Sequence, residues 1–449
     1  MAEEIADLDR QHVWHPFTQM RDWCGETPLV IEAADGTDLV DDEGRRYIDG
    51  VSSLWANVHG HRHPLIDQAV RDQLERVAHS TMLGLTHPGG AELAARLVDI
   101  APPGLTRVFY SDSGSTAVEV ALKMAFQFWQ QRGGQHTRRS SFISLRDGYH
   151  GDTLGAVSVG GMDLFHGAYR PLLFRSHRVT AGDVVELDLA LDLQGEEIAA
   201  VIVEPLVQGA AGIRVQPPGY LRQVRELCDR HGVFLICDEV ATGFGRTGTM
   251  FACEQERVAP DFLCLGKGLT GGYMPLAATL TTEKVHDGFL GAHEDYRTFF
   301  HGHTFSGNPL ACAAAIASLD AFEQDSTLLR LQPKIRLAGE LLAEVAAMPE
   351  VSEVRGHGLM IGIDLGAHDP ALRMGHRVTL EARRRGAVIR PLGDVVVLMP
   401  PLAISKADLR RLVEITSVSI RAAHENAYGS APAVVEPEAP AVAEIAKAA

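Results

Sequence analysis

Two stretches decide the fold of this chain: FLICDEVATGFGRTG at residues 234–248 and PDFLCLGKGLTGG at residues 260–272. Each holds a short apolar run that is bounded by turn residues and leads to a charged residue, Asp238 in the first and Lys267 in the second. Such runs are typical of strands covered on both faces, as in a parallel sheet. The carboxyl ends of these strands border the crevice in which open α/β sheets bind ligands. The sequence therefore predicts an α/β fold with a carboxylate and an ammonium group at its binding edge.

The residues around these two charges favour pyridoxal phosphate as a ligand. Gly266 and Gly268 leave room for Lys267 to approach a cofactor aldehyde, and partial burial lowers the pKa of a lysine so that its amine becomes nucleophilic. A carboxylate that pairs with the protonated ring nitrogen turns this cofactor into an electron sink, and Asp238 is the candidate. An ion pair between Asp238 and Lys267, or two simple strand ends, would explain the same spacing.

Length, charge and cysteine use narrow the class of protein. A chain of 449 residues with 46% apolar content can bury a large core, which predicts one long α/β unit with a smaller partner domain. The net charge of −17 argues against a surface for nucleic acid or anionic membrane. None of the six cysteines forms a CxxC pair, and Cys237 and Cys264 lie inside the apolar runs, which indicates free thiols in a reducing compartment. The acidic N-terminus and the absence of long apolar runs predict a cytoplasmic protein.

A candidate phosphate site lies in TRVFYSDSGSTAVEVALKMAFQFW, residues 106–129. An apolar run ends there in a Gly/Ser-rich turn, and a helix pattern follows. Backbone N–H groups at such a helix start bind anions, and the helix dipole adds to the attraction. Gly114 and Ser115 are the predicted phosphate cradle. Ser113 or Ser115 would also cap the helix, which is compatible with phosphate binding.

Other candidate site residues follow further strands and turns. Tyr149, in the turn-rich segment RDGYHGDT, offers an aromatic ring to stack on a planar cofactor. The buried strand AAVIV ends at Glu204, in what should be the same crevice. His303 and Thr304, in HGHTFSGNP, offer donors to a phosphate. Arg390 lies between apolar residues and suits a carboxylate ligand bidentately, although a structural ion pair is an equally good reading of its position.

Three histidines, His59, His61 and His63, alternate along the segment before Pro64. This spacing suggests a metal site on a strand. No carboxylate or cysteine accompanies them and the proline breaks the element, so we expect no metal here.

The domain organisation follows from changes in pattern along the chain. Hairpin punctuations at Asp35-Gly36 and Glu43-Gly44 predict a small antiparallel sheet, preceded by an irregular aromatic arm and followed by a helix that starts near Pro64. The expected parts are an N-terminal arm and small sheet that belong to the small domain (1–60), a large cofactor-binding α/β domain (61–327), a small C-terminal α+β domain (328–424) and an Ala/Pro/Glu-rich disordered tail (425–449).

Taken together, several motifs resemble the class III aminotransferases, which have the aspartate aminotransferase fold, that is, fold type I of the pyridoxal-phosphate-dependent transferases. The motifs are SDSGSTAVEVALKMAFQFW, DGYHGDT, EPLVQGAAG, DEVATGFGRTG, GKGLTGG, HGHTFSGNP and RPLGDVVVLMPP. The resemblance covers nearly everything except the terminal tails. It implies that Lys267 bonds covalently to the cofactor, that Asp238 pairs with the ring nitrogen, and that Gly114 and Ser115 bind the phosphate.

The resemblance also assigns roles around the substrate. It makes Tyr149 the ring-stacking aromatic and a member of the catalytic set with Lys267 and Asp238. It implies that His303 and Thr304 reach the phosphate from the neighbouring subunit, which requires a homodimer. The implied substrate-lining residues are Leu54, Trp55, Tyr149 and Gly302, together with Arg390 as the arginine that holds a substrate carboxylate.

Two further motifs, WHPFTQM and SSLWANVHGH, resemble the biotin-pathway branch of this family. That branch converts 8-amino-7-oxononanoate to 7,8-diaminononanoate in a ping-pong reaction through pyridoxamine phosphate, usually with S-adenosylmethionine as amino donor. The typical pocket has a tyrosine, a tryptophan, a proline and a tyrosine at the positions that hold Phe17, Leu54, His303 and Leu402 here. Fewer aromatic and hydroxyl groups remain to hold an adenosyl group, so we expect L-lysine to compete as donor.

Two alternatives remain from the sequence. A broader ω-amino-acid:pyruvate transaminase would share the cofactor site without handling the long keto acid. A binding or regulatory module on the same fold would be expected to lack Lys267 or Asp238, and both are present.

Overall fold

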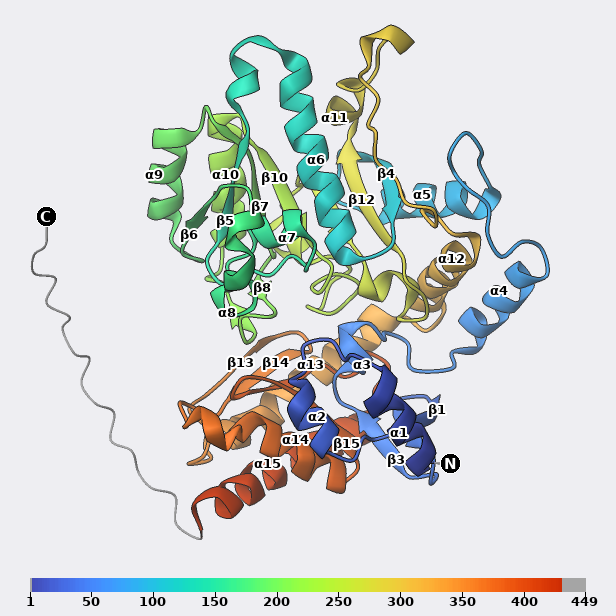
Figure 1. The fold of residues 1–449 in the computed structure, drawn as a ribbon, viewed down its shortest axis with the longest axis vertical. Helices are drawn as coiled ribbons and strands as arrows, with labels where there is room; N and C mark the ends of the chain where they lie inside the picture. Colours follow the sequence, from blue (N-terminus) through green and yellow to red (C-terminus); the bar gives the residue numbers. More distant parts are fainter. Residues whose placement is uncertain (1, 430–449) are drawn as a thin grey trace, which may run out of the picture.

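The computed structural model of the chain describes residues 2–429 and has a large and a small part, the upper and lower halves of Figure 1. The large part contains a seven-stranded sheet in the order β4-β12-β11-β10-β7-β5-β6. Neighbouring strands from β11 to β6 are parallel, and β12 is antiparallel to both β11 and β4. The predicted α/β fold with a large, mostly parallel sheet is therefore confirmed. The strands are β4 (Leu105–Ser111), β5 (Ser141–Leu145), β6 (Ser176–Val179), β7 (Ile198–Val203), β10 (Phe234–Asp238), β11 (Phe262–Leu265) and β12 (Ala277–Thr282).

The two apolar runs that decide the fold form β10 and β11, side by side and in parallel. Asp238 lies opposite Cys264 in the register, so the strand ends are brought together as predicted. Every residue of both strands is buried, which explains why neither run alternates. Cys237 and Cys264 are free thiols, and burial raises their pKa values well above the ordinary range.

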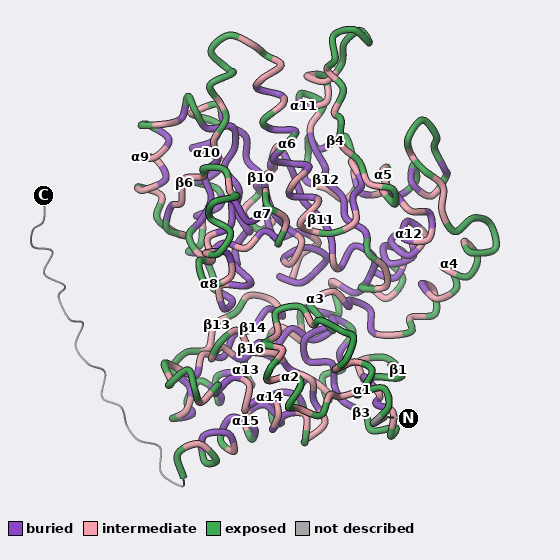
Figure 2. Tube along the Cα trace, in the orientation of Figure 1, coloured by how far each residue is buried: buried purple, intermediate pink, exposed green. Residues whose placement is uncertain are grey.

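Helices cover both faces of this sheet, and the buried residues appear as the purple interior of Figure 2. α6 (Gly114–Arg132) packs on the face that carries Phe234 and Phe262, and α10 (Tyr220–His231) packs on the face that carries Leu235 and Leu263. Burying one such side chain contributes about 1.5–3 kcal/mol. The other large-part helices are α4 (Pro64–Leu74), α5 (Pro88–Ile100), α7 (Leu154–Val159), α8 (Asp163–His166), α9 (Val184–Gln194), α11 (Glu283–Asp287) and α12 (Pro309–Gln324).

The small part joins the beginning of the chain to its end. β1 (Ile31–Asp35), β2 (Asp38–Asp41) and β3 (Arg46–Asp49) form the antiparallel sheet predicted for this segment, and β15 (Ala387–Val388) adds to β3 in parallel. A second sheet has the order β13 (Glu353–His357), β14 (Met360–Asp364), β17 (Val395–Leu398) and β16 (Arg390–Leu392). The helices α13 (Thr327–Ala346), α14 (Met374–Arg384) and α15 (Lys406–Tyr428) complete this part.

The N-terminal arm differs from the irregular segment predicted from its aromatic residues and proline. It contains two helices, α1 (Ala2–His12) and α2 (Met20–Gly25). Asp9 holds them together, because its carboxylate accepts a hydrogen bond from Trp23 Nε1 at 2.7 Å and lies 2.9 Å from His15 Nε2. Capping side chains and long-range hydrogen bonds of this kind stabilise short helices that propensity alone does not predict.

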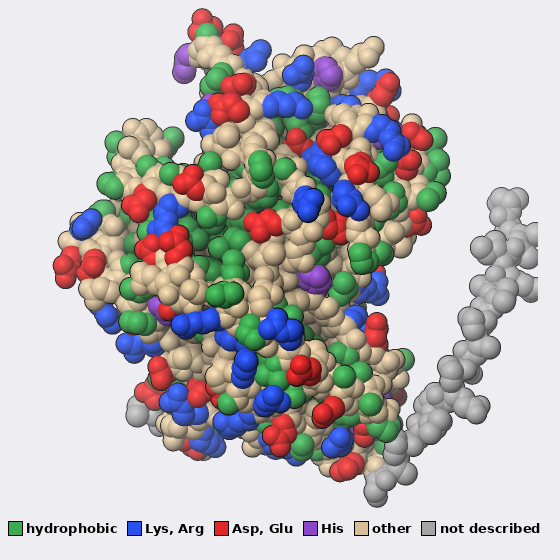
Figure 3. All heavy atoms as spheres, turned by 180° about the vertical axis from the view of Figure 1, so that it is seen from behind, with side chains coloured by type: hydrophobic (Ala, Val, Ile, Leu, Met, Phe, Trp, Pro, Cys, Tyr) green, Lys and Arg blue, Asp and Glu red, His purple; other side chains and the backbone are tan. Residues whose placement is uncertain are grey.

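Several short elements complete the fold. They are α3 (Ser52–Trp55), β8 (Val207–Gln208), β9 (Arg214–Val215) and the 3₁₀ turns Gly134–Arg138, Gly167–Leu172, Ala252–Glu256, Lys267–Thr270, His293–Asp295 and Pro370–Leu372. Residues 425–428 form the last turn of α15, so the helix continues into the segment predicted to be a disordered tail; residues 430–449 of that segment lie outside the described residues. Among the described helices, none is both long and apolar enough to cross a membrane. On the face seen in Figure 3, acidic and basic side chains are interspersed over the small part.

Candidate active site

A cavity of about 150 Å³ lies at the carboxyl ends of β7, β10 and β11. Its lining includes seven residues that the sequence singled out: Trp55, Gly114, Ser115, Tyr149, Glu204, Asp238 and Lys267. We call it the inner cavity. The structure thus brings together the ammonium, the carboxylate, the helix start and the aromatic ring that were predicted from separate motifs.

Lys267 opens the turn after β11 and has a left-handed backbone with φ +42°. Its side chain is half-buried, and Nζ lies 4.9 Å from the centre of a Trp55 ring. Burial lowers the pKa of Lys267, against the opposite influence of Asp238 and Glu204. Gly268 allows close packing here, because a Cβ at this position would lie 2.9 Å from Phe244 Cβ. Burial therefore favours the neutral amine, which is the form that attacks an aldehyde.

Asp238 is buried at the end of β10 and does not pair with Lys267. Its Oδ2 lies 2.8 Å from His150 Nδ1, and its Oδ1 accepts a hydrogen bond from Val240 N at 3.1 Å. Between residues 2 and 429, no ion pair joins Asp238 to Lys267, so a simple lysine–aspartate pair does not explain the two charges. The carboxylate is instead fixed in place beside the cavity, with its charge available to a ligand.

Glu204 is a second buried carboxyl group in the cavity wall. Its Oε1 accepts a hydrogen bond from Tyr149 N at 3.1 Å and its Oε2 accepts one from Gly209 N at 2.8 Å. Burial raises the pKa of Glu204 to about 7, and the nearby Asp238 adds to this effect. The two hydrogen bonds connect the turn that carries Tyr149 to the turn at Gly209, where a Cβ would lie 3.1 Å from Trp55 Cζ3. Glu204 thereby positions both aromatic walls of the cavity.

The start of α6 forms the opposite side of the cavity. The Ser113 hydroxyl accepts a hydrogen bond from Thr116 N at 3.3 Å, so this serine caps the helix as expected. Within the described part of the chain, the amide hydrogens of Gly114 and Ser115 have no acceptor. Gly151 is needed beside them, since its φ is +121° and a Cβ there would lie 1.9 Å from Ser115 Oγ. Two free amide donors at a helix start provide an anion site.

The chain is similar to known proteins over most of its length. The family model for class III aminotransferases matches residues 20–420. The chain belongs to this family. A relative from Nitratidesulfovibrio vulgaris, named adenosylmethionine-8-amino-7-oxononanoate aminotransferase, is 58% identical over 94% of this chain and 82% of its own length. A protein of the same name from Geobacter sulfurreducens is 50% identical over 92% of this chain and 96% of its own length.

Solved structures agree with this assignment. The adenosylmethionine-8-amino-7-oxononanoate aminotransferase of Methanocaldococcus jannaschii has a TM-score of 0.92 and 41% identity, and the match covers 94% of this chain and 99% of that one. A PLP-bound amine transaminase from an uncultivated Pseudomonas species has a TM-score of 0.84 and 38% identity, with coverage of 92% and 98%. Class III aminotransferases depend on pyridoxal phosphate, and the inner cavity fits that cofactor because it combines an amine, a buried carboxylate, free amide donors and an aromatic wall.

The remaining predicted residues do not line the inner cavity. Leu54, Gly302 and Thr304 are exposed on the surface of this single chain. His303 is partly exposed, and its Nδ1 lies 2.7 Å from Asp112 Oδ2, directly before the cap of α6. Of these residues, His303 is the one with a side-chain contact near the start of α6, and none of them is part of the lining of the inner cavity.

Arg390 lines a second cavity of about 360 Å³, which lies between α2, α14 and β16. We call it the outer cavity. Burial lowers the pKa of Arg390, and the nearby Tyr149 acts in the opposite direction. Val51 and Ser53 line the outer cavity and Trp55 lines the inner cavity, so the short segment 51–55 borders both. Arg390 forms no ion pair with any residue in the described range, which leaves its guanidinium free for a ligand.

Five residues at the inner cavity were given no role from the sequence: His150, Gly151, Ala210, Val240 and Ala241. His150 and Gly151 follow Tyr149 directly, so a turn that brings the tyrosine to the cavity also brings them. Val240 lies two residues after Asp238, and a Cβ on Gly114 would lie 2.5 Å from Val240 Cγ1. Their positions follow from the strand ends, but their contacts depend on the tertiary fold.

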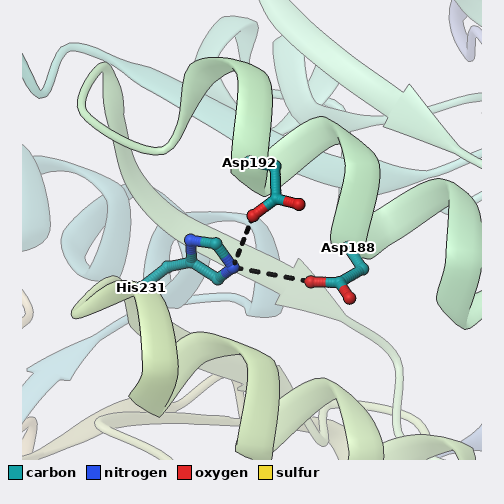
Figure 4. A group of neighbouring side chains, drawn as sticks. All are labelled: Asp188, Asp192 and His231. Carbon is teal, nitrogen blue, oxygen red and sulfur yellow. Dashed lines mark ion pairs between the residues drawn. The ribbon is translucent and has the colours of Figure 1, made fainter.

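Two groups of side chains have the composition of metal sites and contact neighbouring protein groups. His59, His61 and His63 contact Ser318, Asp49 and Asp325 respectively, and the ring centres of His59 and His63 lie 5.6 Å apart. A surface group of Asp188, Asp192 and His231, shown in Figure 4, joins α9 to the end of α10. His231 Nε2 lies 3.5 Å and 3.6 Å from the two carboxylates, and Asp188 also pairs with Arg230 at 2.9 Å. This second group is a surface ion-pair network.

Proposed function

We propose that this class III aminotransferase transfers an amino group to 8-amino-7-oxononanoate and so forms 7,8-diaminononanoate, a step of biotin synthesis. The observation that carries the proposal is the high identity, over nearly the whole chain, to the aminotransferase of Nitratidesulfovibrio vulgaris that is named for this acceptor. The outer cavity supports it, because an unpaired arginine beside the inner cavity suits the carboxylate of a long keto acid.

Cofactor binding would use groups on opposite sides of the inner cavity. Bound pyridoxal phosphate supplies an aldehyde that reacts with amines and a protonated ring that withdraws electrons from the carbon next to the transferred nitrogen. The free amides of Gly114 and Ser115 would bind the phosphate, and Asp238 would face the ring nitrogen. His150 fixes the orientation of the Asp238 carboxylate through the bond to Oδ2. Tyr149 and Val240 would confine the ring between them.

Lys267 would act twice in each half of the reaction. It would first release the cofactor when an amine substrate takes its place, and its free amine would then move a proton between the substrate carbon and the cofactor carbon. The lowered pKa of Lys267 supports this role, because a neutral amine is the form that accepts a proton. Donor and acceptor would occupy the same site in turn, so one pocket must fit two dissimilar molecules.

Substrate recognition would extend from the inner to the outer cavity. Trp55 lies over the amine of Lys267, which places it beside the reacting end of a substrate. Arg390 would hold the far carboxylate by a bidentate hydrogen-bonded pair. Leu54 and Gly302 are proposed to complete the lining, although both are exposed in the single chain.

The exposed residues support a homodimer in which each chain completes the site of the other. Two loops of the large part carry exposed apolar side chains: Leu83 and Leu85 in one, and Tyr296, Phe300 and Phe305 in the other. His303 and Thr304 lie in the second loop. A second copy would cover these side chains and bring the His303–Thr304 pair to the phosphate of its partner. Light scattering of the purified protein should give twice the mass of the 48.6 kDa chain, and a monomeric active protein would contradict this assembly.

The amino donor is proposed to be S-adenosylmethionine or L-lysine. Phe17 lines the outer cavity and packs edge-on against Phe165 with ring centres 5.5 Å apart, so this position offers an aromatic ring without a hydroxyl group. Leu402 has no bearing on the donor: it is buried against Gly245 and lines neither cavity. A coupled assay with each donor separates the two. Turnover with S-adenosylmethionine alone would reject lysine.

A broader ω-amino-acid:pyruvate transaminase is the second candidate, because solved relatives of this chain include an amine transaminase and an ω-transaminase. Such an enzyme would use pyruvate at least as well as the long keto acid. Measuring kcat/KM for 8-amino-7-oxononanoate and for pyruvate with the same donor decides between them. We also propose a cytoplasmic location, since five of the six cysteines are buried free thiols.

A further inference from the structure

Charged side chains surround the outer cavity, and only some of them compensate one another. Asp22 and Glu26 come from α2 in the N-terminal arm. Arg373 Nη1 lies 3.0 Å from Asp22 Oδ2, and His376 Nε2 lies 2.9 Å from Glu26 Oε1. These pairs fasten the arm to the start of α14. Both acidic side chains of the cavity lining are therefore already paired.

Two arginines in the same lining have no such partner. Arg383, in the last turn of α14, and Arg390, in β16, form no hydrogen bond or ion pair through their side chains with any residue in 2–429. The Arg383 Nε atom is sealed from solvent and unpaired. Burial lowers the pKa of Arg383, and the more distant Glu26 and Tyr47 only partly offset this. A guanidinium kept buried without a partner costs free energy that a bound anion would recover.

Of the ten other residues in the lining, six are apolar and four, Thr18, Gln19, Ser53 and Thr379, are polar, so part of the wall suits a hydrocarbon chain. Trp23 and Phe17 come from the arm, and Val51, Val388 and Ile389 come from the small part. An apolar wall beside unpaired cations fits a molecule with an alkyl chain and a terminal carboxylate better than a small polar anion. Because Val51 and Ser53 line the outer cavity and Trp55 lines the inner cavity, the other end of such a molecule would extend past this segment toward the inner cavity.

We propose that Arg383 is a second carboxylate-binding arginine, which acts with Arg390 to hold the carboxylate end of a long-chain acceptor in the outer cavity. The inference rests on the proposed function, in which the acceptor is a nine-carbon keto acid. It assigns the choice between long and short acceptors to the C-terminal end of α14 as well as to β16. Small acceptors such as pyruvate would not reach Arg383.

Calorimetric binding of nonanoate to the cofactor-loaded protein tests the proposal, because this nine-carbon acid has the chain and carboxylate but no group that reacts. Nonanamide is the uncharged counterpart. Arg383→Gln should weaken nonanoate binding about 5- to 10-fold and leave nonanamide binding within about 2-fold, and Arg383→Lys should restore much of the loss. Arg384→Gln is the matched control, because Arg384 is the exposed next residue and pairs with Glu381.

Unchanged nonanoate binding in Arg383→Gln would overturn the proposal, and so would equal losses for nonanoate and nonanamide, which would show a change of cavity shape only. A second experiment uses the protein without substitutions, so it does not require a variant to fold. An arginine-specific dicarbonyl reagent should modify Arg383 and Arg390 more slowly with nonanoate present, as read by peptide mass, while Arg384 is unaffected. Equal modification of Arg383 with and without nonanoate would reject the site.

Failure of the proposed function gives a different pattern. One outcome is that the protein does not turn over 8-amino-7-oxononanoate and still binds nonanoate in an Arg383-dependent way. That result would reject the proposed acceptor and support the proposed carboxylate site. If the protein turns over that keto acid with the same KM in Arg383→Gln, the acceptor is right and the role of Arg383 is wrong.

Discussion

The inner and outer cavities differ in whether their charged side chains have partners within the protein. In the inner cavity, the Asp238 carboxylate is fixed by His150, and Glu204 is held by two backbone amides. In the outer cavity, Arg383 and Arg390 have no partner in the described part of the chain. Groups that do chemistry must be positioned before a substrate arrives, whereas groups that select a substrate gain most when the substrate itself supplies the missing charge. We therefore assign catalysis to the inner cavity and the choice of acceptor to the outer cavity.

The two cavities also differ in how the chain builds them. The inner cavity lies at the ends of neighbouring strands of one sheet, which fixes it within the core of the large part. The outer cavity is assembled from the N-terminal arm, α14 and β16, which are far apart in the sequence. Changes in the inner cavity should therefore affect every substrate, and changes in the outer cavity should affect some substrates more than others.

The largest effect is expected from Asp238→Asn. Removing one partner of a buried charged interaction costs about 3–5 kcal/mol, which corresponds to a loss of about 10²–10⁴ in kcat/KM. Both half-reactions should lose by similar factors, because the ring nitrogen has the same role in each. Stopped-flow measurement of each half-reaction tests this. Asp192→Asn, in the surface ion-pair network of Figure 4, is the control. A loss confined to one half-reaction would contradict the claim that changes in the inner cavity affect every substrate.

Glu204 should give the next largest effect, as a pH dependence of stability in the cofactor-free protein. The folded-state pKa of about 7 lies above the ordinary 4.5, so the native state binds this proton more tightly than the unfolded state does. Stability from this group is complete below pH 4.5 and decreases as pH rises to 7, by about 3 kcal/mol in total.

Glu204→Gln cannot ionise and should remove that decrease. Its amide would lose the bond that Oε2 accepts from Gly209 N, so the variant should be less stable than the parent near pH 4.5. As the pH approaches 8, the gap between the two denaturation midpoints should close or reverse. A gap that stays constant across this range would show that Glu204 is ionised in the folded protein.

Arg390→Ala should affect mainly the keto-acid half of the reaction. An unpaired substrate carboxylate costs about 2–3 kcal/mol, or a factor of about 30–150 in kcat/KM for 8-amino-7-oxononanoate. The donor half-reaction should change little, because this arginine lies outside the inner cavity. Substitution of Arg384, which is exposed on α14, provides the control. Equal losses in both halves would place Arg390 in the chemistry and not in acceptor choice.

The smallest effect is expected from Phe17→Ala. This ring lines the outer cavity and packs edge-on against Phe165, and an aromatic pair of this type contributes about 0.5–1.5 kcal/mol. The KM for the long keto acid should increase about 2- to 10-fold, and kcat for pyruvate should be unchanged. A matching loss with pyruvate would show that the arm closes over both cavities alike.

The sequence is informative about the inner cavity for a physical reason. Asp238, Lys267, Gly114 and Ser115 each follow a strand or open a helix, so local pattern predicts their common edge. The partner of Asp238 could not be predicted, because the contact with His150 joins positions 88 residues apart. Local pattern holds no information about such contacts.

The outer cavity was predicted less well. Arg390 was identified by its apolar neighbours in the sequence. The sequence did not indicate that Arg383 lacks a partner among the described residues, because this depends on the tertiary pairs that Asp22 and Glu26 form with Arg373 and His376. The arm was predicted to be irregular, since the hydrogen bonds that stabilise its helices are tertiary. Leu402 stands at a pocket position of the related enzymes but is buried in the core here.

Covalent attachment of pyridoxal phosphate to Lys267 is the central claim, and borohydride reduction of the cofactor-loaded protein tests it most directly. Peptide mass mapping should find the reduced cofactor on Lys267. Lys334 is an internal control, because burial also lowers its pKa although its amine donates to Leu402 O, away from the cavity. The account predicts a label on Lys267 alone and none in Lys267→Ala; a label on another lysine, or no label in the unaltered protein, would contradict it.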